Sequence, residues 1–207
     1  MNIPTDRQII DDLIAPPPGG DAAALARLRA RLAEEADAEG LLDVAYRTMD
    51  SPVGPLLLAA TPAGLVRVAF ELENHDEVLV ELSTAISPRI LRSPRGVDDV
   101  ARQLDEYFAG RRRAFELPVD LQLAKGFRRV VLEHLREIPY GATESYTVVA
   151  RSAGNPKAVR AAGSACATNP IPLVVPCHRV VRSDGTYGQY RGGPAVKHAL
   201  LTMEAGR

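Results

Sequence analysis

A thiol and an imidazole are neighbours near the C-terminal end of the chain, where an apolar run over 171–175 leads into Pro176, Cys177 and His178. Free cysteine has a pKa of about 8.5, so little thiolate exists at neutral pH unless a base takes the proton. His178 could be that base, and Glu204 is a candidate carboxylate to orient its imidazole. These residues predict nucleophilic chemistry at Cys177. The alternative is an inert buried thiol beside a surface histidine, and the surrounding motifs must decide between the two.

Composition narrows the kinds of protein that the 207 residues can form. Hydrophobic residues make up 46% and charged residues 25%, which is typical of a globular protein. Only two cysteines are present, Cys166 and Cys177, so a disulfide scaffold is excluded. Together with four scattered histidines they do not suit a four-ligand zinc site. The apolar runs are too short to cross a membrane and the first residues lack a secretory leader, so we expect a cytoplasmic protein.

Charge is distributed unevenly along the chain although the net charge is −1. Residues 125–207 contain 12 Lys and Arg against 5 Asp and Glu, a net charge of +7. Residues 1–124 contain 13 Lys and Arg against 21 Asp and Glu, a net charge of −8. A basic C-terminal region can bind a polyanion such as a nucleic acid. Chance segregation of surface charge is the alternative.

Residues 1–41 are predicted to be an extension, and residues 42–120 a small α/β domain with a mostly antiparallel sheet. In the extension, Pro16–Gly20 breaks the chain, Asp21 caps a helix that runs to Glu39, and Gly40 ends it. In the domain, alternating apolar residues and Pro/Gly turns predict strands, followed by helices and a linker. The predicted strands are Leu42–Met49, Leu56–Ala60, Leu65–Phe70 and a further candidate at Phe115–Val119; the predicted helices are His75–Ala85 and Val97–Phe108, with Ser87–Gly96 as the linker.

Residues 121–207 are predicted to form a helical domain, so the expected fold class is α+β. The predicted helices are Phe127–Glu137, Thr143–Ser152 and Lys157–Thr168. The last two are joined by a tight turn at Gly154, and the second carries Lys157 and Arg160, which is typical of a helix-turn-helix. The second domain therefore combines a helix-turn-helix with the cysteine motif.

The C-terminal motifs resemble those of the O6-alkylguanine-DNA alkyltransferase family. The resemblance covers about residues 42–204, because the hairpin Ser51–Ala60 also resembles the N-terminal domain of that family. The most specific part is Pro-Cys-His-Arg with its Asn-Pro-x-Pro lead-in. The matching segments are Ile138–Gly141, Ser145-Tyr146, Asn155–Ala161, Asn169–Pro172, Val175–Val180, Tyr190–Gly193, Lys197 and Leu200-Leu201 with Glu204.

The resemblance implies a role for each residue of the cysteine site. Cys177 would accept the alkyl group, His178 would take the thiol proton through water, and Glu204 would orient His178. Asn169 would be the hinge between the recognition helix and the active-site strand. Tyr146 would donate a hydrogen bond to guanine N3 and crowd the phosphate of a flipped nucleotide.

The resemblance also implies a base pocket and a DNA interface. Tyr190, Arg191 and Pro172 would close the base pocket. Arg160 would enter the base stack at the position that a flipped base leaves. Four further positions resemble phosphate contacts: Thr147, Asn155, Arg128 and Ser183. Each of these could instead be an ordinary surface or packing residue.

The implied activity is direct DNA repair by a methylated-DNA–protein-cysteine S-methyltransferase. Cys177 would take the alkyl group from O6-alkylguanine in double-stranded DNA, irreversibly and once per chain; O4-alkylthymine is a second candidate lesion. Guanine O6 lies inside the stack, so the nucleotide must be flipped out. No cofactor and no metal are expected because the acceptor is the protein's own thiol. The protein is expected to act as a monomer, with cooperative binding to DNA left open.

Two departures from the family pattern leave the pocket width and the preferred alkyl group open. The segment Ala124–Arg129 replaces the usual Thr-Pro-Phe-Gln, and the helix that follows lacks the usual tryptophan. The loop Gly185–Arg191 is bulkier than the common one.

Three other functions are less consistent with these residues than direct repair. A lesion-binding protein that does not repair would lack an acceptor, and Cys177 argues against it. A transcription regulator that uses self-alkylation as a signal would need a second DNA-binding domain, which residues 1–41 do not show. A thiol protease is disfavoured because His178 is adjacent to the cysteine in sequence.

Overall fold

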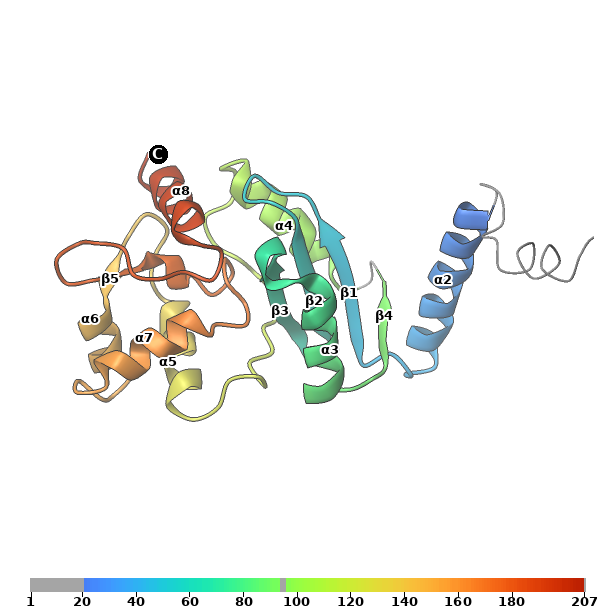
Figure 1. Cartoon of the computed structure of the whole chain (residues 1–207), viewed down its shortest axis with the longest axis horizontal. Coiled ribbons are helices and arrows are strands. Elements are labelled where there is room, and N and C mark those ends of the chain that lie inside the picture. Colours follow the sequence, from blue (N-terminus) through green and yellow to red (C-terminus); the bar gives the residue numbers. More distant parts are fainter. Residues whose placement is uncertain (1–20, 94–95, 207) are drawn as a thin grey trace, which may run out of the picture.

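The computed structural model describes residues 21–93 and 96–206, and its N-terminal unit is built on a four-stranded sheet (Figure 1). The strand order is β3-β2-β1-β4. β1 pairs antiparallel with β2 and β2 with β3, whereas β4 joins β1 in parallel, so the prediction of a mostly antiparallel sheet is confirmed. The elements of this unit are β1 (Val44–Met49), β2 (Leu56–Thr61), β3 (Gly64–Phe70), the 3₁₀ helix η1 (Glu71–Glu73), α3 (His75–Ala85), β4 (Ile90–Arg92) and α4 (Asp98–Phe108).

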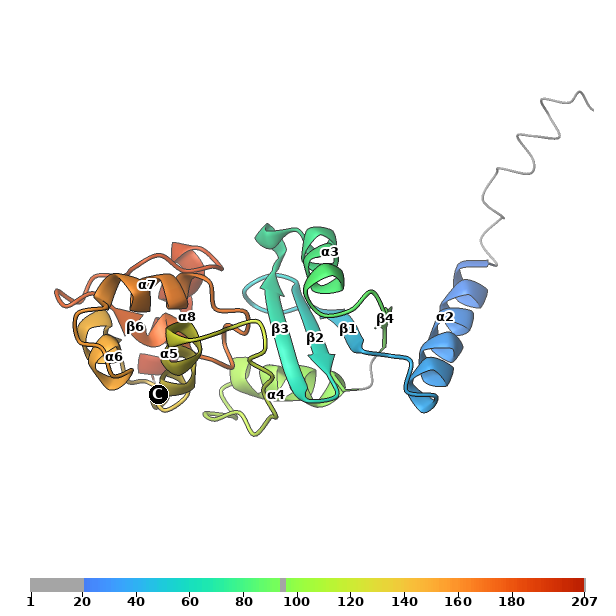
Figure 2. The same ribbon diagram turned by 90° about the horizontal axis from the view of Figure 1, so that it is seen from below.

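The central strand β2 is buried on both faces because a helix packs on each side of the sheet. Leu57 lies in the apolar cluster that contains Leu82 of α3. Leu58 points to the other side, into the cluster that contains Leu104 of α4. Figure 2 shows α3 and α4 on opposite faces of the sheet. This sandwiching explains why β2 reads as a continuous apolar run instead of an alternating one.

The C-terminal unit is helical, which confirms the α+β fold class. α5, α6 and α7 pack together, and α6 and α7 form the predicted helix-turn-helix. A two-stranded parallel pair, β5 with β6, ties the start of α6 to the segment that follows Cys177. The elements are α5 (Phe127–Leu135), β5 (Glu144–Ser145), α6 (Tyr146–Ser152), α7 (Val159–Ala167), the 3₁₀ helix η2 (Cys177–Arg179), β6 (Val180–Val181) and α8 (Pro194–Ala205).

Two parts of the N-terminal unit differ from the sequence prediction. The candidate strand Phe115–Val119 is wrong: only an isolated bridge joins Val119 to Leu65. Pro118 has no N–H to donate, so this segment cannot continue a hydrogen-bonded ladder. The predicted linker Ser87–Gly96 contains β4, a three-residue edge strand too short to stand out by periodicity.

Two helices of the C-terminal unit begin later than predicted. α6 begins at Tyr146 instead of Thr143, because residues 144–145 pair with β6 and the Ser145 hydroxyl caps the helix by accepting from the Val148 N–H at 3.3 Å. α7 begins at Val159, because the preceding residues form a turn closed by the bond from the Ala158 N–H to Asn155 O, 3.0 Å.

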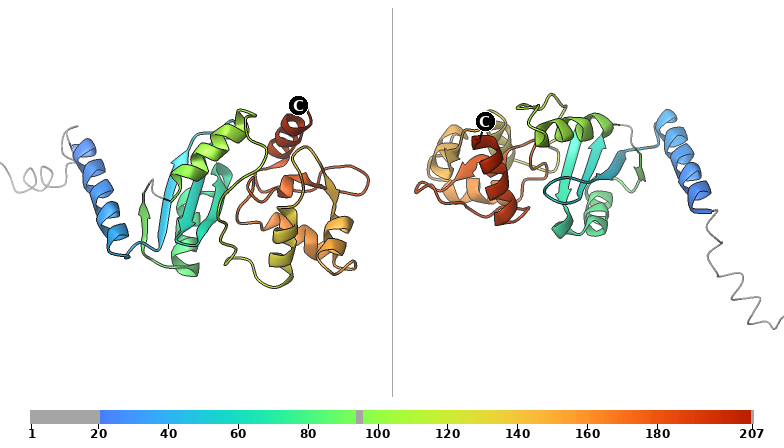
Figure 3. Two further views of the ribbon diagram at one scale, coloured as in Figure 1. Left: turned by 180° about the vertical axis from the view of Figure 1, so that it is seen from behind. Right: turned by 90° about the horizontal axis from the view of Figure 1, so that it is seen from above.

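The helix α2 (Asp21–Ala38) lies beside β4, at the end of the molecule far from α8 (Figures 1 and 3). Its predicted end is confirmed by Gly40, which has a φ of 68°. The predicted break at Pro16–Gly20 lies outside the described residues. Among the residues described, no helix has the length and apolar character needed to span a membrane.

The two units share one apolar core along β3. The same cluster contains Val68 of β3, Leu104 of α4, and Leu132 and Ile171 of the C-terminal unit. The Val68 N–H donates to Pro170 O at 2.9 Å, so the backbones of the units are also joined. The segment that precedes Cys177 is therefore held against the sheet.

Candidate active site

Cys177 lies at the first position of η2 and is buried, with only 2% of its surface exposed. The segment 170–176 before it is a loop, not the active-site strand that the resemblance implied. Three prolines in this segment remove the N–H groups that a strand would donate. Leu173, at its middle, is fully buried with a φ of 74°, a strained conformation for a branched residue that the surrounding packing must hold.

Asn169 closes this loop and contacts the sulfur. Its side-chain NH₂ donates to Val175 O at 2.8 Å and to Cys177 Sγ at 3.1 Å. Its Oδ1 accepts from the Ile171 N–H at 3.0 Å. Asn169 is fully buried, so these bonds fix the sulfur relative to the end of α7.

His178 faces a carboxylate, that of Glu204, which three side chains share. Its Nε2 lies 3.0 Å from Glu204 Oε1. Arg179 donates to both oxygens of Glu204 at 2.9 Å, and the hydroxyl of Tyr107, on α4, donates to Oε1 at 2.6 Å. The backbone N–H of Gly141 adds a fifth donor at 3.2 Å. All of these side chains are buried, so Glu204 is held in one orientation.

The hydrogen bonds to Glu204 keep this buried carboxyl ionised. Burial alone would raise its pKa, but donation by His178, Arg179 and Tyr107 holds the pKa well below its usual range. An ionised carboxylate 3.0 Å from His178 Nε2 requires that nitrogen to carry a proton. The other ring nitrogen, Nδ1, is then the one that can accept, and it is buried with no hydrogen-bond partner in the described part of the chain.

Both members of the Cys-His pair are neutral at pH 7. Burial raises the pKa of the Cys177 thiol to about 11, although the bond from Asn169 and the charge of Lys197 oppose this. Burial also lowers the pKa of His178, against the opposing effect of Glu204. The thiol therefore needs a base to become a nucleophile, and the adjacent imidazole is free to accept a proton.

Tyr146 begins α6 and is half-buried under a loop. A Cβ added to Gly188 would lie 2.2 Å from the Tyr146 hydroxyl, so only glycine lets the loop come this close. A Cβ added to Gly163 of α7 would lie 4.0 Å from the same ring. Burial raises the pKa of Tyr146 to about 12, which keeps the hydroxyl protonated and able to donate.

The three residues predicted to close the base pocket lie in different surroundings. Tyr190 is buried, with its ring 6.2 Å from that of His178. Pro172 is buried in the loop before Cys177. The Arg191 guanidinium forms an ion pair with Glu73, which belongs to the N-terminal unit.

The structure brings some of the predicted DNA contacts together and sets one apart. Thr147 and Ser183 are hydroxyl neighbours at 3.5 Å, and Arg160 and Asn155 are exposed near the start of α7. The Arg128 guanidinium donates to the carbonyl oxygen of Thr168, the residue before Asn169, and lines an inter-unit cavity of about 260 Å³.

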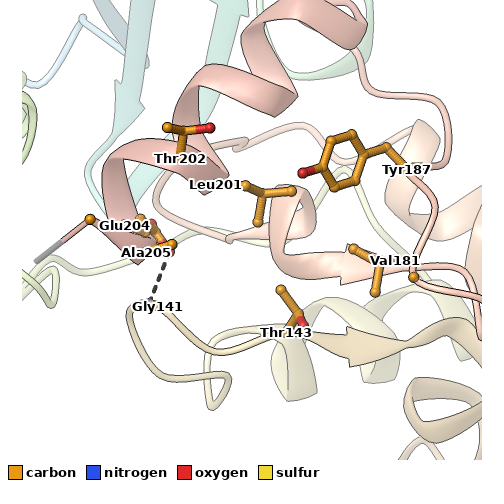
Figure 4. Close-up of a pocket in the computed structure, with 10 residues that line it drawn as sticks. Gly141, Thr143, Val181, Tyr187, Leu201, Thr202, Glu204 and Ala205 are labelled. Atoms are coloured by element: carbon orange, nitrogen blue, oxygen red, sulfur yellow. Dashed lines mark hydrogen bonds between the residues drawn. The ribbon is translucent and has the colours of Figure 1, made fainter.

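A larger cavity, of about 530 Å³, lies on the far side of Glu204 (Figure 4). Thr143, Val181, Tyr187, Leu201 and Glu204 are among its lining residues, and Cys177 is not. Glu204 borders this cavity, but its carboxylate stays buried. Among the described residues no group of three or more His, Cys, Asp or Glu could hold a metal ion.

Four residues of this site had no role in the sequence prediction. Arg179 and Lys197 were noted only as parts of motifs; Lys197 lies seven residues before Glu204, a spacing that places both on one helix face. Its Nζ donates to Val180 O at 2.6 Å. Tyr107 and Glu73 had no local signal for their contacts with the C-terminal unit, because their partners there, Glu204 and Arg191, lie far along the chain.

Comparison with known proteins gives matches over most of the chain. Residues 126–206 match the family model "6-O-methylguanine DNA methyltransferase, DNA binding domain". Residues 44–121 match "6-O-methylguanine DNA methyltransferase, ribonuclease-like domain". A relative from Methanosarcina acetivorans, named methylated-DNA–protein-cysteine methyltransferase, is 37% identical over 159 residues, which is 77% of this chain and 97% of the relative.

Solved structures give the same result. The O6-methylguanine methyltransferase of Mycobacterium tuberculosis is 36% identical with a TM-score of 0.69, over 79% of this chain and 94% of that one. A structure of the M. tuberculosis protein OGT in complex with DNA is 36% identical with a TM-score of 0.67, over 78% of this chain and 93% of that one.

Proposed function

Because the chain belongs to the 6-O-methylguanine DNA methyltransferase family, we propose that it repairs alkylated DNA by moving the alkyl group from a base to its own Cys177. The observation that carries the proposal is the buried Cys177, which accepts a hydrogen bond from Asn169 and adjoins a His178–Glu204 pair. A buried neutral thiol can be activated only if a neighbouring group accepts its proton. The imidazole of His178 can accept it, because the ionised Glu204 stabilises the imidazolium that forms.

The transfer is a single nucleophilic displacement at the alkyl carbon. The Cys177 thiol gives its proton to Nδ1 of His178, through a bridging water, and the sulfur attacks the alkyl carbon. The carbon–O6 bond breaks and its electron pair stays on guanine, which takes up one proton. That proton balances the one that the thiol gave to His178, so the transfer consumes no acid or base. Tyr146, still protonated because its pKa is raised, donates a hydrogen bond that stabilises the departing base. The product is a thioether, so each chain acts once and needs no cofactor.

Access to the sulfur requires that the base leave the duplex. With 2% of Cys177 exposed, an alkyl carbon reaches it only after the nucleotide has been flipped out of the stack. Arg160 would occupy the gap in the stack. Thr147, Asn155, Ser183 and Arg128 would contact phosphates, which the basic charge of residues 125–207 supports.

The substrate of this reaction is O6-alkylguanine in double-stranded DNA, with O4-alkylthymine as a second lesion, and the acting species is a monomer. Residues 42–120 and 121–207 form the two domains and residues 1–41 an extension. The matches to family models over 44–121 and 126–206 support this division.

Intact-protein mass spectrometry tests the proposed function. Incubation with an excess of duplex carrying O6-methylguanine should add one methyl group to each chain. Peptide mapping should find that group on Cys177. A chain that stays unmodified, or that carries the methyl group on Cys166 alone, would reject the assignment.

Replacing Arg160 with alanine should slow transfer from duplex DNA and leave transfer from free O6-benzylguanine unchanged. The arginine acts only on the flipped state, so its loss should cost about 1–3 kcal/mol, or roughly 5- to 150-fold in rate. Arg151→Ala, at an exposed arginine of α6, is the matched control. Equal losses on both substrates would contradict the stack-filling role.

A further inference from the structure

Glu73, at the end of η1, is a buried carboxylate between the two units. Only 7% of its side chain is exposed. Its Oε2 accepts from the Arg67 guanidinium at 2.6 Å and pairs with the Arg191 guanidinium. Its Oε1 accepts from the Phe70 N–H at 2.9 Å. One carboxylate of the N-terminal unit therefore pairs with an arginine from each unit.

The Arg67 side of this network leads to the hinge of the active site. Arg67 is 4% exposed in its side chain and donates to Pro170 O at 3.3 Å. The same carbonyl accepts the Val68 N–H of β3. Pro170 follows Asn169, whose amide contacts Cys177 Sγ. Arg67 thus fixes one wall of the site relative to the sheet.

The ion pair with Arg191 connects Glu73 to the opposite wall of the active site, the loop that carries Tyr190. Arg191 follows Tyr190, whose ring meets Phe70 edge-on at 5.6 Å and His178 at 6.2 Å. A Cβ on Gly192 would come within 3.1 Å of the Phe70 ring, so the loop lies directly on the N-terminal unit. The Glu73 ion pair and the Phe70 contact together hold this loop in position.

We propose that Glu73 is a positioning residue of the transfer reaction: through Arg191 it sets how closely the Tyr190–Gly193 loop approaches Cys177, and thereby limits the size of the alkyl group accepted. This inference rests on the proposed function. Buried ion pairs hold their partners in place because an unpaired buried charge is costly. Without the carboxylate, the Arg67 and Arg191 charges repel each other and the nearby Arg128, and the loop moves outward.

The test compares transfer rates from two duplexes of one sequence, carrying O6-methylguanine or O6-benzylguanine. Arg191→Gln removes the ion pair between Arg191 and Glu73 and keeps the Glu73–Arg67 pair, so the chain should fold normally. We expect the benzyl-to-methyl rate ratio to rise by about fivefold in this variant and in Glu73→Gln, with no further rise in the double variant. Arg89→Gln, which removes an exposed ion pair with Asp43, is the matched control and should leave the ratio unchanged.

Each outcome decides between distinct conclusions. An unchanged ratio in Arg191→Gln, or an equal change in Arg89→Gln, overturns the positioning role while leaving the repair function in place. Additive changes in the double variant also overturn it, because the two residues would then act separately. If the wild-type chain takes no alkyl group from either duplex, the proposed function itself fails. If Glu73→Gln does not fold, the ratio in Arg191→Gln decides.

Discussion

A chain with serine at position 177 should bind duplexes that carry O6-methylguanine and transfer no methyl group. The Asn169 amide that contacts the sulfur can donate to a serine hydroxyl as well, so the loop should keep its shape. A hydroxyl is a far weaker acid and nucleophile than a thiol, and His178 cannot compensate for this difference. We expect the transfer rate to fall by roughly 10⁴-fold or more, the scale seen when a catalytic nucleophile is removed.

Intact mass and fluorescence anisotropy would measure transfer and binding separately. Cys166→Ser is the matched control, because Cys166 is the other buried thiol, on α7, and its pKa is also raised by burial. This control should transfer one methyl group per chain at the wild-type rate. A methyl group on the Cys177→Ser chain, or loss of transfer in the control, would contradict the assignment of Cys177 as the acceptor.

Replacing Glu204 with glutamine should both destabilise the fold and slow transfer. The Arg179 guanidinium would remain buried without its counter-charge, which typically costs about 3–5 kcal/mol. His178 would lose the carboxylate that fixes its tautomer and stabilises its protonated form, so transfer should slow by about 10²-fold or more. Urea unfolding and transfer rates at pH 7 would measure the two effects. Glu133→Gln, at an exposed ion pair with Arg129, is the matched control.

The stability effect of Glu204→Gln should depend on pH. The pKa of Glu204 in the folded protein lies well below its ordinary 4.5, so the carboxylate stabilises the fold fully above that value. This stabilisation is lost as the pH falls through the folded-state pKa, and the difference between wild type and variant should shrink below pH 4.5. A difference that stays constant from pH 7 to strongly acidic solution would show that the ionised carboxylate is not what stabilises the network.

The site draws on both units, because side chains of the N-terminal unit contact residues that surround Cys177 and His178. Tyr107 of α4 donates to the carboxylate that orients His178, and Glu73 holds the loop that carries Tyr190. Each of these links is a single hydrogen bond or ion pair from a buried side chain. The pairing of the units therefore determines both the electrostatics at His178 and the space above Cys177.

Much of the fold could be predicted because local patterns determine it. The apolar run of β2, the turns at Gly54 and Gly64, and the amphipathic repeat of α4 each depend on neighbours within a few residues. The Asn169–Cys177 contact is also local, since only eight positions separate the two residues. The cysteine motif could thus be identified as a candidate site from its residues and their spacing.

The long-range partners were decided by the tertiary structure alone. Tyr107 lies 97 positions before Glu204, and Glu73 meets Arg191 across the two units, so no periodicity relates them. The burial that raises the pKa of Cys177 and lowers that of His178 also depends on how the helices pack on β3. The sequence by itself determined which atoms could react, because residue type sets chemical capacity. Only the packed structure decided their protonation and surroundings, because these depend on exclusion of water and on charges brought together from distant parts of the chain.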